Sequence, residues 1–190
     1  MATRSLDYLA IDGDNHYYEP DDCCTRHLDP ALKDRSVHVR EEKDGARNWY
    51  FGDRPLSFAR GARDYVMKPG EYRAFRSGAA FDPNQPPELL PALSPEFSDR
   101  DVRLGAMDRQ GLQACLMIPS FGLAFEAECM SDPVAACGAV SAFNRWVEED
   151  WGFDYRDRIF SPATLSLLDR DLAVKELDRV LAAGARMVML

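Results

Sequence analysis

The sequence lacks several features that would place it in a membrane or nucleic-acid-binding class. It contains no run of eighteen or more apolar residues, so no transmembrane helix is expected. Its first residues hold no apolar stretch typical of a signal peptide, so no secretory leader is expected. Basic residues are in deficit, with 23 Lys and Arg against 32 Asp and Glu, and the formal net charge is -9. Such a surface repels phosphate groups, which argues against nucleic-acid partners and anionic membranes.

Cysteine is scarce, and it is not arranged in paired motifs. The five cysteines are Cys23, Cys24, Cys115, Cys129 and Cys137. Their number is odd, and the adjacent Cys23 and Cys24 do not form the CxxC pattern of zinc ribbons or thioredoxin-like proteins. We therefore expect free thiols in a reducing compartment, the cytoplasm.

Apolar residues are plentiful enough to build a core. They make up 46% of the 190 residues, and we expect a single domain over residues 1–190. Residues 8–12 form a short apolar run that predicts a buried strand. The polar segment Gly13-Asp14-Asn15-His16 then lies at the C-terminal end of that strand.

A long insertion is expected after this first strand, at about residues 30–97. Within it, residues 36–56 alternate apolar and polar side chains, and Asp44-Gly45 supplies the positive φ angles of a tight β-hairpin turn. The stretch from Pro69 to Pro95 is rich in proline, which helix interiors and central strands exclude. That stretch predicts an irregular loop.

The remainder of the chain alternates capped helices with short apolar strands. The expected elements are a helix from an N-cap at Ser98 to Gly111, a strand over 112–118, a helix beginning at Asp132-Pro133, a strand over 159–163, a helix from Asp169 to Gly184 and a strand over 187–190. Alternating strands and helices indicate βαβ units and a parallel sheet.

The apolar residues in this part also predict which side chains face the core. They are Ala136, Val140, Phe143 and Val147 on one helix, Leu172, Leu177, Val180 and Leu181 on the next, and the aromatic residues Trp146, Trp151 and Phe153.

Chain length then limits the fold class within α/β. A complete (β/α)8 TIM barrel takes about 250 residues, and the insertion leaves room here for about four strands. The chain is therefore either a small open sheet or an incomplete (β/α)8 barrel with about four parallel strands, carrying a β-hairpin and a Pro-rich insertion after the first strand.

The strongest chemical signal lies at the end of the first strand. In extended backbone, residues two apart project on the same side, so Asp14 and His16 would point the same way. A carboxylate and an imidazole placed together can share one divalent metal ion. Barrel active sites lie at this C-terminal end of the strands. On spacing alone, the alternative is a turn-capping aspartate beside an ordinary histidine.

The segment from Asp14 to Pro20, Asp-x-His-x-x-Glu-Pro, resembles the opening of the amidohydrolase-related ("amidohydrolase 2") family. Four later segments are similar to that family in the same order. They are the helix-to-strand junction at 107–112, the loop after the second strand at 118–123, the Asn-x-Trp helix at 143–146 and the Gly-Ala-Arg entry to the fourth strand at 182–186.

The resemblance implies a metal-dependent hydrolase or decarboxylase acting on small organic molecules, which include aromatic and carboxylated ones. It implies a divalent metal, Zn or Mn, held first by Asp14 and His16. Glu19, Ser120 and Phe121 are candidates to line the site or to support the ligands. Family members take further ligands from later strands, so this chain is expected to carry only the first metal-ligand motif. The other histidines, His27 and His38, are expected to be surface or hydrogen-bonded residues.

Two other readings remain open at this point. A half barrel would leave strand edges uncovered, so the chain could be a catalytically inactive or non-enzymatic half that pairs with another copy or with a missing C-terminal half. The remaining alternative is a compact α/β binding domain that shares only local patterns with the family.

Overall fold

The computed structural model describes residues 8–43, 45, 47–57, 65–67, 89–91, 94–120 and 125–190. The chain divides into two compact units, one made of Met1–Arg60 with Pro95–Leu190 and the other of Gly61–Ser94. The described residues form a mixed α/β fold with a parallel sheet in the first unit. In this described part, no helix has both the length and the apolar character needed to cross a membrane.

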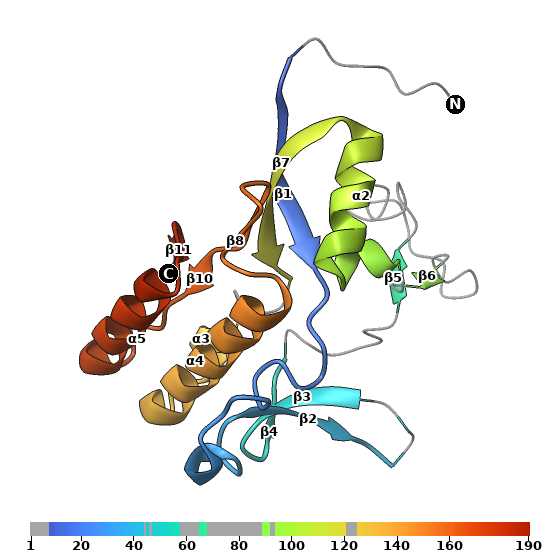
Figure 1. Cartoon of the computed structure of the whole chain (residues 1–190). Coiled ribbons are helices and arrows are strands. Elements are labelled where there is room, and N and C mark those ends of the chain that lie inside the picture. The colour runs from blue at the N-terminus through green and yellow to red at the C-terminus, as the bar shows by residue number, and fades with distance from the viewer. Residues whose placement is uncertain are drawn as a thin grey trace, which may run out of the picture. The chain divides into compact units, whose positions relative to one another are not determined.

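The parallel sheet follows the order of the chain. Strand β1 (Ala10–Tyr17) pairs with β7 (Leu112–Pro119), and β7 pairs with β9 (Ile159–Phe160), all in parallel (Figure 1). Directly after β9, strand β10 (Ala163–Thr164) pairs in parallel with β11 (Val188–Met189). The predicted strand over 159–163 is therefore two short pieces with different neighbours. The described strands do not close into a barrel.

Helix α2 (Arg100–Gln110) connects β1 to β7, and its caps explain its limits. The sequence suggested Ser98 as N-cap, but Asp99 takes that role, because its Oδ1 accepts from the backbone N–H of Asp101 at 2.8 Å and of Val102 at 2.9 Å. Gly111 ends the helix at φ 72°, a left-handed conformation that glycine adopts without steric cost.

Three further helices follow: α3 (Phe125–Glu128), α4 (Pro133–Asp150) and α5 (Arg170–Ala182). The predicted caps of the longer two are confirmed, since the Asp132 and Asp169 side chains accept from backbone N–H groups of the first turn. The predicted inward face of α4 is confirmed as well. On α5 the prediction for Leu181 was wrong: that side chain is 52% exposed, and the buried polar Glu176 lies on the inward face instead.

The predicted β-hairpin is present as β2 (Val37–Glu41) and β3 (Arg47–Phe51), extended by β4 (Arg54–Pro55). The last paired residues are Glu41 and Arg47, so the connection spans residues 42–46 and is longer than the tight two-residue turn expected. Gly45 has a φ of 81°, as expected, whereas Asp44 lies outside the described residues. The first unit also contains strand β8 (Asp154–Tyr155), which pairs antiparallel with β9, and two single-turn 3-10 helices, η1 (Pro30–Leu32) and η2 (Pro95–Phe97).

The second unit contains an antiparallel strand pair, β5 (Tyr65–Met67) and β6 (Leu89–Pro91). The sequence predicted an irregular loop from Pro69 to Pro95, and within it the pairing of β6 was missed. Pro91 is tolerated in β6 because each strand of a two-stranded pair has a free edge. Most of the Pro-rich stretch lies outside the described residues.

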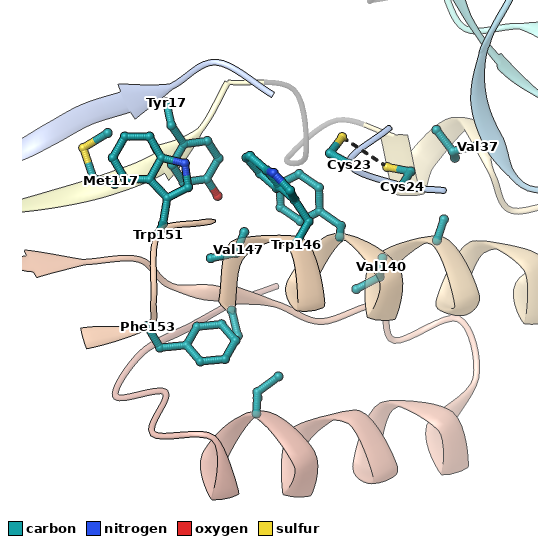
Figure 2. Packing of buried hydrophobic residues seen from close by; sticks show 14 of the residues in the cluster. Tyr17, Cys23, Cys24, Val37, Met117, Val140, Trp146, Val147, Trp151 and Phe153 are labelled. Carbon is teal, nitrogen blue, oxygen red and sulfur yellow. Dashed lines mark hydrogen bonds between the residues drawn. The ribbon is translucent and has the colours of Figure 1, made fainter. Parts of the chain in front are cut away.

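An aromatic cluster fills the core between β1 and α4. The Tyr17 ring lies 5.2 Å from that of Trp146 in an edge-on arrangement and 5.5 Å from that of Trp151 in a stacked one (Figure 2). The aromatic core residues predicted from the sequence are all buried. The five cysteines are buried, and none of them forms a disulfide bond in the described part of the chain; Cys23 Sγ lies 3.8 Å from Cys24 Sγ.

A buried polar network joins α4, α5 and the end of β10. The Asn144 amide donates to Thr164 O at 2.8 Å, and its Oδ1 accepts from Thr164 N–H at 2.9 Å. The same amide donates to Glu176 Oε1 at 2.9 Å, and Glu176 also accepts from Ser141 Oγ and from Arg179. Asn144 thus completes the backbone hydrogen bonding of a strand with a side chain.

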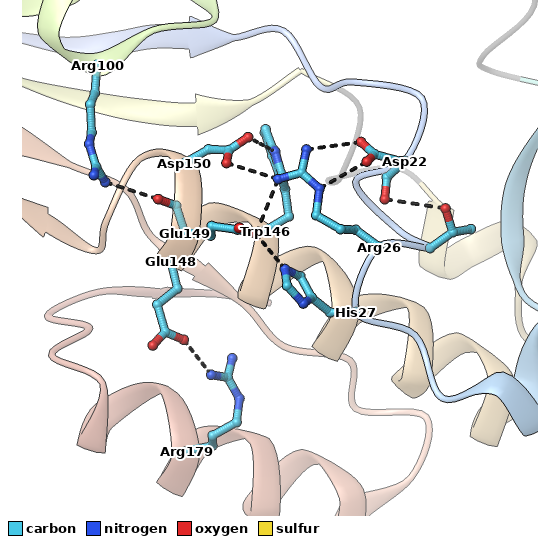
Figure 3. Close-up of polar contacts among 10 residues, drawn as sticks. Asp22, Arg26, His27, Arg100, Trp146, Glu148, Glu149, Asp150 and Arg179 are labelled. Carbon is cyan, nitrogen blue, oxygen red and sulfur yellow. Dashed lines mark hydrogen bonds and ion pairs between the residues drawn. The ribbon is translucent and has the colours of Figure 1, made fainter.

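A network of charged side chains joins the segment after β1 to the C-terminal end of α4 (Figure 3). Arg26 contacts Asp22 at 3.0 Å, Glu149 at 3.2 Å and Asp150 at 3.0 Å. His27 Nε2 lies 2.7 Å from Glu149 Oε2, and these hydrogen bonds, that of His27 first, lower the pKa of Glu149. These contacts hold the segment that follows β1 against the C-terminal end of α4.

Candidate functional site

The predicted metal motif lies within β1, which extends further than the apolar run suggested. Asp12 pairs with Cys115 and Asn15 with Met117, so β1 uses one residue more than β7 between these two pairs. This extra residue is a β-bulge at Gly13 and Asp14, which are both exposed. A bulge changes the direction of side chains, and bulges are common beside active sites.

Asp14, in the bulge, and His16, just after it, have their side chains close together, as their spacing predicted. His16 Nε2 is 3.4 Å from Asp14 Oδ1, and the two side chains are 43% and 87% exposed. Both residues are therefore held close to each other while remaining open to a ligand at the C-terminal end of β1.

The pair borders an open hollow of about 480 Å³. Its lining residues come from β1 and the residue after it, from η2, and from the residue that follows β7: Asp14, Asn15, His16, Tyr18, Phe97 and Ser120. The rings of Tyr18 and Phe97 lie 5.1 Å apart, and Tyr18 N–H donates to Phe97 O at 2.8 Å. Burial raises the pKa of Tyr18, so its phenol is neutral at physiological pH. The hollow thus combines a carboxylate and an imidazole with an aromatic wall.

A polar network lies behind the motif. Asp12 Oδ1 accepts from Asp14 N–H at 3.1 Å, and Asp12 Oδ2 accepts from the Asn15 amide at 2.8 Å. Asn15 Oδ1 accepts from His16 N–H at 3.0 Å and from Arg103 Nη2. Arg103 is only 3% exposed, so a cation from α2 lies directly beneath the motif.

The other candidate residues are placed differently. Ser120 lines the hollow, and its hydroxyl donates to Tyr17 O at 3.0 Å. Glu19 is buried and is not among the lining residues, and Phe121 lies outside the described residues. His27 contacts Glu149, as described above, and His38 Nδ1 lies 3.1 Å from Ser36 O, so both are hydrogen-bonded residues away from the motif.

The donor types at the motif fit a divalent metal, but their number is small. Carboxylate oxygen and imidazole nitrogen are common ligands of Zn and Mn. His16 Nδ1 is buried and has no hydrogen-bond partner in the described part of the chain. Within those same residues, no group of three or more His, Cys, Asp or Glu side chains is placed to hold one ion. Catalytic metals usually have three protein ligands, so these residues supply part of a site.

Sequence reasoning missed the network behind the motif. Arg103 occupies a position one turn before Ala106 and Met107, on the buried face of α2. An arginine on an otherwise apolar helix face is the signal that would have indicated a buried partner. Asn15 gave no such signal, because its inward orientation depends on the bulge.

Comparison with known proteins shows similarity among solved structures. No protein-family model and no curated protein matches the sequence. Among solved structures, the chain is similar to the crystal structure of an amidohydrolase from Mycobacterium avium subsp. paratuberculosis K-10, with 39% sequence identity and a TM-score of 0.86. The match covers 96% of this chain and 49% of that one, so this chain spans about half the length of the amidohydrolase. The chain is therefore amidohydrolase-like in fold and sequence over nearly all of its length.

Proposed function

We propose that this chain supplies the first half of a metal-dependent (β/α)8 barrel of the amidohydrolase type, with Asp14 and His16 as the first ligands of a divalent ion. The observation that carries the proposal is the convergence of these two side chains, 3.4 Å apart, at the C-terminal end of β1 beside an open hollow. The similarity to an amidohydrolase over 96% of the chain supports it. The parallel pairings of β1 with β7, of β7 with β9 and of β10 with β11, in chain order, are of the kind that such a barrel requires.

The chemistry follows from the groups around the hollow. A bound Zn or Mn ion would act as a Lewis acid and lower the pKa of water for hydrolysis. Asp14 and His16 would hold that ion, and the wall of Tyr18 and Phe97 would exclude water from one side. A small organic molecule fits a hollow of about 480 Å³. Hydrolysis is the reaction that the similarity favours, and decarboxylation of a carboxylated or aromatic substrate is the alternative on this type of scaffold.

The site is completed, in this proposal, by a second half barrel. Within the described residues, β1 has β7 as its only strand neighbour and β11 has only β10. Apolar side chains are exposed at both edges: Leu9 at 77%, Ile11 at 65%, Val188 at 41% and Leu190 at 76%. Open apolar strand edges favour pairing with further strands. The partner we propose is a C-terminal half of the same barrel, or a second copy of this chain.

Metal content per chain tests the metal-binding proposal. The protein is purified by gel filtration, and its metals are measured by elemental analysis for the wild type, Asp14→Ala, His16→Ala and the control His38→Ala. We expect about one Zn or Mn per wild-type chain, as for a single shared site, and its loss in the two motif variants only. Unchanged metal content in Asp14→Ala and His16→Ala would show that these residues are not the metal ligands.

A second candidate is a half barrel without catalytic activity that serves only to associate with a partner. The observation that favours it is the small number of donors, since the described residues place no third ligand at the motif. Absence of metal in the wild type, together with a dimer or larger assembly by light scattering, would support this candidate. A stable monomer would argue against the open strand edges being association surfaces.

A further inference from the structure

We propose that Arg103 and Asn15 are positioning residues, which together with Asp12 hold the β-bulge of β1 in the conformation that brings the Asp14 carboxylate and the His16 imidazole together. The inference rests on the proposed function in treating Asp14 and His16 as metal ligands. The conformation of the bulge is argued from the hydrogen bonds alone. None of the three residues is proposed as a metal ligand. Asn15 also lines the hollow, but its positioning role lies in the hydrogen bonds of its side chain.

Four hydrogen bonds around the bulge end on two side chains, those of Asp12 and Asn15. The carboxylate of Asp12 accepts from the Asp14 backbone at 3.1 Å and from the Asn15 amide at 2.8 Å. The Asn15 oxygen accepts from the His16 backbone at 3.0 Å and from Arg103. The backbone N–H of each proposed ligand is therefore held by the side chain of a residue one or two positions earlier.

Arg103 is the part of this arrangement that comes from elsewhere in the fold. It lies on α2, is 3% exposed, and its guanidinium carbon lies 4.8 Å from the centre of the Phe97 ring. Its Nε has no hydrogen-bond partner in the described ranges. Burial lowers the pKa of Arg103, while the nearby charges of Glu96 and Asp12 favour its charged form. The guanidinium donates to the side-chain carbonyl oxygen of Asn15, and this charge-assisted hydrogen bond orients that group.

Arg103 contacts both a residue that holds the bulge and the aromatic wall of the hollow. Phe97, over which Arg103 lies, also forms the aromatic wall with Tyr18. One buried side chain therefore fixes the wall and the bulge relative to each other. Partners of this kind, which hold metal ligands without binding the metal, usually change metal affinity when they are replaced.

Amide hydrogen exchange of the metal-free chain, followed by NMR, tests the positioning role without depending on metal. The variants are Asn15→Ala and the paired Asn15→Leu/Arg103→Met, which exchanges the buried polar pair for apolar side chains and so preserves packing. Arg109→Met is the matched control, because Arg109 is an exposed arginine on the same helix. The Co²⁺ dissociation constant and visible spectrum of each variant are measured in parallel.

We expect the His16 amide to exchange about tenfold faster or more in both test variants, because its acceptor, the Asn15 side-chain oxygen, is removed. The Asp14 amide should also exchange faster, because the Asp12 carboxylate that accepts from it loses the Asn15 amide that holds it in place. Amides of α4 should exchange at the wild-type rate, and Arg109→Met should match the wild type throughout. Co²⁺ binding should weaken by about 10–100-fold in the test variants.

Two results would overturn the proposal. One is wild-type exchange at Asp14 and His16 in both test variants. The other is an equal acceleration across α4, which would mean that Arg103 and Asn15 stabilise the fold as a whole. Failure of the wild type to take up Co²⁺ would contradict the proposed metal function alone, because the exchange rates still decide the positioning role.

Discussion

Replacing Asn144 should destabilise the chain more than any exposed substitution on the same helix. Asn144 is fully buried in α4, and its amide and carbonyl groups satisfy both the N–H and the C=O of Thr164. In Asn144→Ala, these two backbone groups lose their partner while remaining buried. Glu176 also loses one donor but keeps Ser141 and Arg179.

The magnitude follows from the groups left without partners. A buried polar group without a hydrogen bond costs about 1–3 kcal/mol, so the two groups of Thr164 together cost about 2–6 kcal/mol. Because domains of this size unfold with about 5–15 kcal/mol, a loss in this range removes a large part of the stability. The isosteric Asn144→Asp keeps the side-chain shape but loses both donors and adds a charge beside Glu176, so it should be at least as damaging.

Urea denaturation followed by circular dichroism measures the effect, with Arg145→Ala as the control because Arg145 is the exposed neighbour on the same helix. The control should change the free energy of unfolding by less than about 0.5 kcal/mol. A loss of under about 1 kcal/mol in both Asn144 variants would refute the reasoning, since it would mean that Thr164 finds other partners at little cost.

Two further predictions concern buried ionisable groups. Tyr17→Phe should leave the free energy of unfolding unchanged or raise it by about 1 kcal/mol, because the Tyr17 hydroxyl is buried without a partner in the described part of the chain; a urea titration that shows a clear loss would contradict this. Burial alone would raise the pKa of Glu176, but hydrogen bonds from Arg179, Asn144 and Ser141 outweigh it, and the folded-state pKa is lowered. The stability from Glu176 is therefore present above its unfolded pKa of about 4.3 and is lost as the pH falls through the lower folded value, so Glu176→Gln should flatten the acid side of the stability curve measured between about pH 5 and pH 2.

The βα part of the fold was predictable because its signals are local. Capping aspartates, Pro133 at the first turn and Gly111 at the end each act within a few residues, so α2, α4 and α5 were found nearly at their bounds. The errors arose where two local candidates compete. Ser98 and Asp99 are both good caps, and only the helix's final position decides between them.

Other features depended on contacts that a sequence does not reveal. Strand β8 (Asp154–Tyr155) pairs antiparallel with β9 through a turn in which Arg156 and Asp157 have positive φ angles of 56° and 53°. These residues are rare in that conformation, so turn statistics gave no warning. Leu181 looked inward by helical spacing, but the hydrogen bonds of Glu176 to Asn144 and Ser141 place that carboxylate on the buried face of α5 instead.

The candidate site divides in the same way. Asp14 and His16 could be paired from their spacing, and the structure brings them together; their role as ligands stays a prediction. The contribution of Arg103 could not be predicted, since it depends on how α2 packs against a β-bulge for which the sequence carries no recognisable signal.

The interruption between β9 and β10 has a geometric consequence for how further strands can add to the sheet. Ile159–Phe160 pairs with β7, whereas Ala163–Thr164, further along the same segment, pairs with β11. β11 is therefore displaced along this segment relative to β7 rather than set level with it. Closing a sheet into a cylinder requires such a cumulative stagger, together with strands that tilt relative to the cylinder's axis. The offset at Ser161-Pro162 thus supplies, within one short segment, part of the shear that a complete barrel would need before its first and last strands could meet.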